Sequence, residues 1–153
     1  MNKELKNHIV HRTLAHSYSV YFLLLMFGVF LDIVFPIRVF HDSVMVAVGF
    51  VFLIFASFLI FWAQKSSRNL LKKEEVTKEH FCVGPYCYTR IPTHWGLFLL
   101  TLGFGFIMNA FFIIIFTIIS FLITKYSFVK KQEKLLEEKF GIPYIEYKKS
   151  VKL

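Results

Sequence analysis

Four long apolar runs constrain what this chain can fold into more than any other feature. They cover residues 19–35, 44–63, 95–108 and 110–128. A helix needs about 20 apolar residues to cross the hydrocarbon core of a bilayer, which is about 30 Å thick. With 56% hydrophobic residues and 20 phenylalanines among 153, the chain has more apolar surface than a soluble domain of this size can bury. The sequence therefore predicts an all-α integral membrane protein, one domain of about four transmembrane helices.

The last two apolar runs are separated only by Asn109. As one helix they would extend about 51 Å at 1.5 Å per residue, which is too long for the hydrocarbon core even with tilt. We therefore expect a short helical hairpin that turns near Asn109. Gly103 and Gly105 would allow its two helices to pack closely.

The basic residues favour the same topology. Arg38 is alone in the loop between the first and second runs, so four spans place 17 of the 18 Lys and Arg on one side. By the positive-inside rule, both termini and the central loop are cytoplasmic in this arrangement, as in a multi-pass protein of a bacterial or archaeal cytoplasmic membrane. The net charge of +8 is then explained by orientation and by membrane lipids with anionic headgroups, and nucleic acid is not an expected partner.

Two cysteines, Cys82 and Cys87, lie in the predicted cytoplasmic loop. Thiols stay reduced in that compartment, so we expect no structural disulfide. A zinc site that adds His80 and His94 is the alternative, but its spacing, H-x-C-x4-C-x6-H, matches no common structural zinc pattern, and we expect no metal.

The charged segment after the fourth run predicts an amphipathic cytoplasmic helix at the C-terminus. Gly141 followed by Pro143 is typical of its end. A second, short surface helix is expected within residues 64–78. The apolar residues that recur at helical spacing in the C-terminal helix are Phe128, Leu135, Leu136 and Phe140.

Two polar segments on either side of the predicted hairpin belong together. They are GPYCYTRIPTHWG, residues 84–96, and KQEKLLEEKFGIPYIEYKKSV, residues 131–151. Together they resemble the motifs of the isoprenylcysteine carboxyl methyltransferase and phospholipid methyltransferase superfamily of integral membrane enzymes. In that family GPY-x-Y-x-RHP-x-Y-x-G precedes a hairpin, and R-x-EE-x-x-L-x-x-x-FG-x-x-Y-x-x-Y follows it.

The resemblance implies an S-adenosylmethionine-dependent methyltransferase that acts on a lipophilic small-molecule or lipidated substrate within the membrane. Arg90 would pair with the carboxylate of the cofactor, Glu133 would accept hydrogen bonds from it, and Gly84 would permit close backbone approach. The catalytic candidates that the motifs indicate are Arg90, His94 and Glu133. By position, the cofactor-binding candidates are Gly84, Pro85, Tyr86, Arg90, Pro92, Gly96, Leu97, Glu133, Tyr144 and Tyr147.

Two departures from the family pattern leave alternatives open. Ile91 replaces the His of RHP while His94 replaces a Tyr, and Gln132 replaces the first of two paired Glu. The chain is then a divergent enzyme with its own substrate, a member that binds the cofactor weakly, or an inactive relative that serves as a membrane binding protein. For His94 a plain interfacial position is the alternative, and for Tyr144 and Tyr147 simple packing of the tail on the hairpin.

A small four-span transporter is the competing class. Asp32 is the one acid inside an apolar run, and an intramembrane carboxylate often marks an ion pathway. An interfacial ion pair or a hydrated side chain near Arg38 and His41 is the simpler account of Asp32. The methyl acceptor and the oligomeric state stay open at this level.

Overall fold

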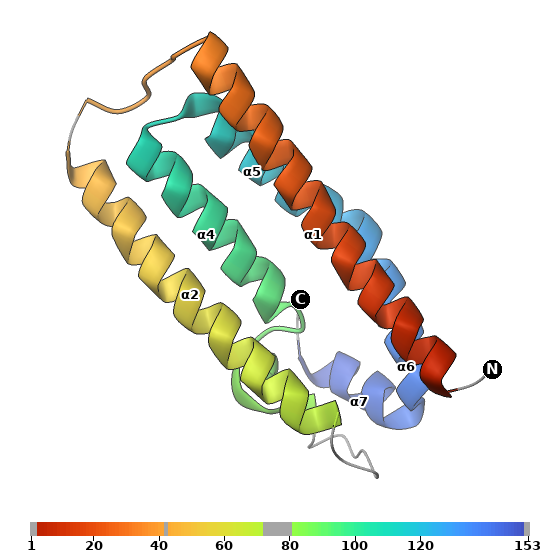
Figure 1. Ribbon diagram of the computed structural model, residues 1–153. Helices are drawn as coiled ribbons and strands as arrows, with labels where there is room; N and C mark the ends of the chain where they lie inside the picture. The colour runs from red at the N-terminus through yellow and green to blue at the C-terminus, as the bar shows by residue number, and fades with distance from the viewer. Residues whose placement is uncertain (1–2, 42, 72–80, 152–153) are drawn as a thin grey trace.

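The computed structural model describes residues 3–41, 43–71 and 81–151 as a bundle of helices (Figure 1). No strand occurs in these ranges, so the all-α expectation is confirmed. The elements are α1 (Lys3–Val34), α2 (Val44–Leu71), the 3-10 turn η1 (Gly84–Cys87), α4 (Pro92–Met108), α5 (Phe111–Ile123), the π-helix η2 (Thr124–Val129), α6 (Lys130–Phe140) and α7 (Ile142–Ser150).

The helices pack as two pairs that the α4–α5 hairpin joins. α2 lies along α4, and α1 lies along α5 and α6 (Figure 1). The turn of the hairpin and the connection from α1 to α2 lie at one end of the bundle. η1 and α7 lie at the other end, where α1 begins and α2 ends. The polar motif segments therefore gather at a single end.

Two helical stretches are long and apolar enough to cross a membrane. They are Val44–Ser67 and Phe111–Phe140, and the apolar stretches Tyr18–Val34 and Pro92–Met108 are shorter. Large apolar side chains point away from the bundle on α2, where Ile54 is 71% exposed. Exposure of such side chains over a whole helix is typical of a surface that another apolar phase covers.

The predicted turn at Asn109 is present. Asn109 has φ 50°, in the left-handed region that Asn tolerates better than most residues. Gly105 faces the other arm of the hairpin, because a Cβ added to it would lie 2.9 Å from Ile114 Cγ1. The expectation for Gly103 was wrong, since that glycine packs against α2, where the added Cβ would lie 2.8 Å from Gly49 O.

Several helix bounds differ from the predicted runs. α1 begins at Lys3, well before its apolar run, and α2 continues to Leu71. Residues 64–71 thus extend α2 instead of starting a separate surface helix, and residues 72–80 lie outside the described part of the chain. A helix can continue through polar residues beyond the end of its apolar run. Hydropathy therefore marks the ends of the apolar run and not the ends of the helix.

The amphipathic C-terminal helix ends at Gly141 as predicted, where φ is 64°. It is continuous with the hairpin, however, because the π-helix Thr124–Val129 joins α5 to α6 without a break. No glycine or proline interrupts residues 111–140, which explains the continuity. After Gly141 the chain turns into α7, with Pro143 in its first turn.

Candidate functional site

The two polar motif segments meet at one end of the bundle. Arg90 Nη1 lies 2.6 Å from Glu133 Oε1, which links the residues before α4 to α6. The hydroxyl of Tyr147 on α7 donates a hydrogen bond of 2.6 Å to the carbonyl oxygen of Tyr86 in η1. This ion pair and this hydrogen bond thus join segments that the whole hairpin separates in sequence.

Arg90 and Glu133 form a buried pair, with side chains only 10% and 9% exposed. Within the described part of the chain, neither Nη1 nor Oε1 has a hydrogen-bond partner, so the contact between them is an ion pair. Lys148 of α7 extends the network, because its Nζ lies 3.0 Å from Glu133 Oε2 and 2.7 Å from Glu137 Oε1. Glu133 therefore has a cation on each side.

Sequence reasoning missed Lys148 and did not foresee that Arg90 and Glu133 would contact each other. A signal for Lys148 was present, since Glu133 and Glu137 are four residues apart and share a face of α6. A cation on the next helix is the natural partner for such a pair of acids. Its motif position beside Tyr147 placed it close to the site.

An aromatic cluster holds α7 against the loop. Phe81, Tyr144, Tyr147 and Val151 are buried together. The ring of Phe81 lies 5.4 Å from that of Tyr144 and 5.5 Å from that of Tyr147. Burial raises the pKa of both tyrosines, so their hydroxyls stay neutral. Tyr144 and Tyr147 pack on the loop before α4. The alternative drawn from the sequence was that they pack on the hairpin.

The two motif glycines pack against α2. A Cβ on Gly84 would lie 2.5 Å from Ser66 Oγ, and one on Gly96 would lie 2.5 Å from Ile60 Cγ1. Gly84 also has φ 62°, which favours glycine for a second reason. The close approach that these glycines allow is therefore to a helix of this chain. Of the other motif positions, Pro85 and Pro92 are buried and Leu97 is half-buried.

The residues that depart from the motifs, Ile91, His94 and Gln132, lie at the same end of the bundle. His94 is only 3% exposed, interacts with Gln132, and has its ring 6.3 Å from that of Tyr18. Its Nδ1 has no hydrogen-bond partner within the described part of the chain. Ile91 is also buried. His94 is thus buried within the bundle at the start of α4, where it interacts with Gln132.

Cys82 and Cys87 are joined by a disulfide, so the expectation of two free thiols was wrong. Their sulfur atoms bond to each other and are not available as zinc ligands. His80, the remaining member of the zinc alternative, lies outside the described residues, and no cluster of metal ligands occurs among the residues that the structure does describe. The expectation failed because it was drawn from the predicted compartment alone, whereas η1 brings the two Cα atoms within 4.4 Å of each other.

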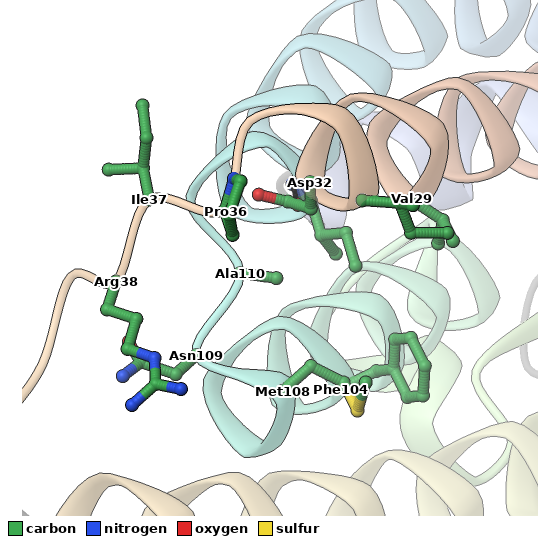
Figure 2. Close-up of a pocket in the computed structure, with 11 residues that line it drawn as sticks. Val29, Asp32, Pro36, Ile37, Arg38, Phe104, Met108, Asn109 and Ala110 are labelled. Carbon is green, nitrogen blue, oxygen red and sulfur yellow. Dashed lines mark hydrogen bonds between the residues drawn. The ribbon is translucent and has the colours of Figure 1, made fainter.

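A pocket of about 280 Å³ lies at the opposite end of the bundle, beside the turn of the hairpin (Figure 2). The carboxylate of Asp32 reaches into this region but is engaged, because it accepts hydrogen bonds from the amides of Phe112 at 3.1 Å and Ile113 at 2.9 Å. These amides belong to the first turn of α5, where a helix leaves its N–H groups without partners. Asp32 therefore caps α5.

Comparisons of this chain with protein-family models, with curated proteins and with solved structures found no match. The fold and the site define the chain as an all-helical protein with two helices able to cross a membrane. Beside the polar ends of these helices it carries a network of ion pairs and a cluster of buried tyrosines.

Proposed function

We propose that this chain is a four-span integral membrane methyltransferase that uses S-adenosylmethionine to methylate a lipophilic or amphiphilic acceptor. The observation that carries the proposal is the contact between the two motif segments, through Arg90 and Glu133 and through Tyr147 and Tyr86. The resemblance predicts that both segments contribute to one cofactor site, and such a site requires them to be adjacent.

The residues present fit the chemistry of this cofactor. Arg90 Nε and His94 Nδ1 are buried atoms without hydrogen-bond partners within the described part of the chain. A guanidinium with an unused N–H suits the carboxylate of an amino acid moiety. The rings of Tyr86 and Tyr144 suit an adenine or a cationic sulfonium. The bound cofactor would supply a methyl group on a positively charged sulfur.

The work left to the protein is orientation. Glu133 holds the Arg90 side chain in place, and in the proposed site it also accepts hydrogen bonds from the cofactor's amine. Correct alignment of acceptor, methyl carbon and sulfur accounts for up to roughly 7 to 11 kcal/mol of rate acceleration in general, so no protein nucleophile is needed. A base matters only for an acceptor that must lose a proton, and His94 is the candidate for that role.

The proposed membrane arrangement places α1, α2, α4 and the continuous α5–η2–α6 helix across the bilayer, with both termini and η1 in the cytoplasm. Support comes from the 17 basic residues that four spans place on one side. The exposed apolar side chains of α1 and α2, among them Phe30 at 60% and Ile54 at 71%, would then contact lipid. A lipophilic substrate reaches such a site from the bilayer.

Binding of S-adenosylmethionine and S-adenosylhomocysteine to the protein in nanodiscs, measured by calorimetry, tests the proposal. We expect saturable binding at micromolar concentrations, and transfer of a labelled methyl group to a membrane lipid extract. The double variant Arg90→Ala, Glu133→Ala should lose binding by at least about tenfold, since a charged hydrogen bond contributes roughly 1.5–3 kcal/mol. Lys131→Ala, at an exposed position on α6, is the matched control.

Absence of binding up to millimolar concentrations would contradict the proposal. It would favour an inactive relative that retains the fold and binds a membrane partner. Unchanged affinity in the double variant would mean that the cofactor binds elsewhere.

A further inference from the structure

We infer that the disulfide between Cys82 and Cys87 is a reversible redox switch that controls the docking of α7. Disulfides that form in a reducing cytoplasm are usually transient, with redox-sensing or catalytic roles. The inference therefore rests on the proposed cytoplasmic location of η1, but not on the nature of the cofactor.

The disulfide joins two residues that each directly follow a contact of α7. Cys82 follows Phe81, whose ring stacks on Tyr147 at 5.5 Å with an interplanar angle of 28°. Cys87 follows Tyr86, whose carbonyl oxygen accepts the hydrogen bond from the Tyr147 hydroxyl. Closing the ring of residues 82–87 fixes the distance between the stacking contact and the hydrogen-bond acceptor. Tyr147 of α7 makes both of these contacts, the ring stacking with Phe81 and the hydrogen bond to Tyr86.

The other side of the closed loop rests on α2. A Cβ on Gly84 would lie 2.5 Å from Ser66 Oγ and 2.9 Å from Trp62 Nε1, so the backbone is in close contact with that helix. The loop is therefore held between α2 and α7. When the disulfide opens, the loop recovers conformational freedom and the carbonyl of Tyr86 is no longer held opposite Tyr147.

Docking of α7 also places Lys148 against Glu133, the partner of Arg90. Release of α7 would remove one of the two cations that flank Glu133. The redox state of the loop would thus affect the ion-pair network through the position of α7. No sulfur atom needs to contact the network.

The two cysteines differ in exposure, and this favours one of them as the point of attack. Cys82 is exposed and Cys87 is half-buried. A thiolate of a protein dithiol of the thioredoxin class attacks Cys82 Sγ, the S–S bond breaks, and Cys87 leaves as a thiolate that takes up a proton. The second thiol of the donor then attacks the mixed disulfide and releases Cys82 as a thiol. Two electrons and two protons pass to this protein, and the donor leaves as a disulfide.

Amide hydrogen exchange of residues 142–150, in the full chain in nanodiscs, tests the switch. The oxidised protein is compared with protein reduced by dithiothreitol, with the thiol state checked by alkylation and mass spectrometry. We expect exchange in α7 to become at least about tenfold faster on reduction, with no change in α5. Equal rates in α7 for the two states would overturn the inference.

Two variants separate the switch from general loosening. The double variant Cys82→Ser, Cys87→Ser should show the α7 exchange rate of the reduced protein, and dithiothreitol should not change that rate. Tyr147→Phe removes the hydrogen bond to Tyr86, so its α7 should exchange faster even when oxidised, and reduction should add little. If reduction speeds α7 exchange in Tyr147→Phe by the same factor as in the unmodified protein, the disulfide does not act through the contact of Tyr147 with Tyr86. The inference would then fail.

Labelling in intact cells distinguishes failure of the topology from failure of the switch. We expect both thiols to react with a membrane-permeant maleimide but not with an impermeant one, and the oxidised fraction to rise when cells are treated with a thiol oxidant. A disulfide that persists in all conditions, with thiols reached only from outside after reduction, would overturn topology and switch together. Thiols labelled from the cytoplasm that never oxidise would overturn the switch alone.

Discussion

Arg90 and Glu133 are paired with each other in the structure, and this pairing limits how the proposed cofactor can bind. Burying two charges is costly unless each has a partner, so loss of Glu133 would leave the charge of Arg90 uncompensated, whereas loss of Arg90 would leave Glu133 paired with Lys148. A carboxylate ligand would then bind to the unused N–H of Arg90 instead of replacing Glu133. His94 and Gln132, at neighbouring positions in the same end of the bundle, interact with each other.

Asp32→Ala is expected to lower stability and leave cofactor affinity unchanged. The substitution removes both acceptors for the amides of Phe112 and Ile113, and loss of a helix cap costs roughly 0.5–2 kcal/mol. Asp32→Asn retains one acceptor oxygen and should cost less. Thermal unfolding in detergent, with calorimetry for binding, provides both readouts. Normal stability combined with lost ion flux would restore the transporter interpretation.

At the scale of the element, α7 is held by groups that must remain protonated. Burial raises the pKa of Tyr144 and Tyr147 above the usual 10.0. The hydrogen bond to Glu137, and then that to Glu133, raises the pKa of Lys148 above the usual 10.5. For each group the docked form therefore binds its proton more tightly than the free form.

Docking of α7 should be insensitive to pH between about 7 and 10 and should weaken at higher pH. A raised pKa stabilises the docked form fully below the value of the free group, and this contribution is lost as the pH rises toward the docked value. Tyrosinate absorbance and limited proteolysis at the α6–α7 junction can follow the transition together. Release of α7 between pH 7 and 9 would contradict this account.

Gly49→Ala should disrupt the packing of α2 on α4. The new Cβ would lie 2.7 Å from Gly103 O, a backbone atom that cannot move without shifting the helix. Overpacking of this kind costs about 1–3 kcal/mol. Gly28→Ala is the control, since its closest contact would be 3.3 Å, to Ile113 Cα. The unfolding temperatures of the two variants should differ, and equal values would show that the helices do not approach this closely.

At the scale of the whole molecule, the arrangement of the helices predicts which segments share a side of the membrane. Tags at the two termini should be protected together in sealed vesicles of one orientation. A tag placed between residues 38 and 41 should be accessible from the opposite side, because one span separates it from the N-terminal segment and one separates it from the central loop. Opposite accessibility of the two termini would imply an odd number of spans.

Particular residues show how far the sequence alone could lead. The turn at Asn109 and the helix end at Gly141 were predicted correctly, because each depends on the backbone preference of one residue. The approach of the two motif segments was expected only through the resemblance. Lys148, the packing of Gly103 on α2 and the cap from Asp32 were missed, because each joins residues far apart in the chain.

The sequence by itself determined that this chain is helical, that its apolar runs are long, and where its hairpin turns. These properties follow from composition, periodicity and single-residue backbone preferences, which act locally. Only the tertiary structure decided that Arg90 meets Glu133, that the motif glycines face α2, and that Cys82 and Cys87 are joined. Such contacts depend on how the helices pack, since a shift of one turn along a neighbour would give each side chain a different partner.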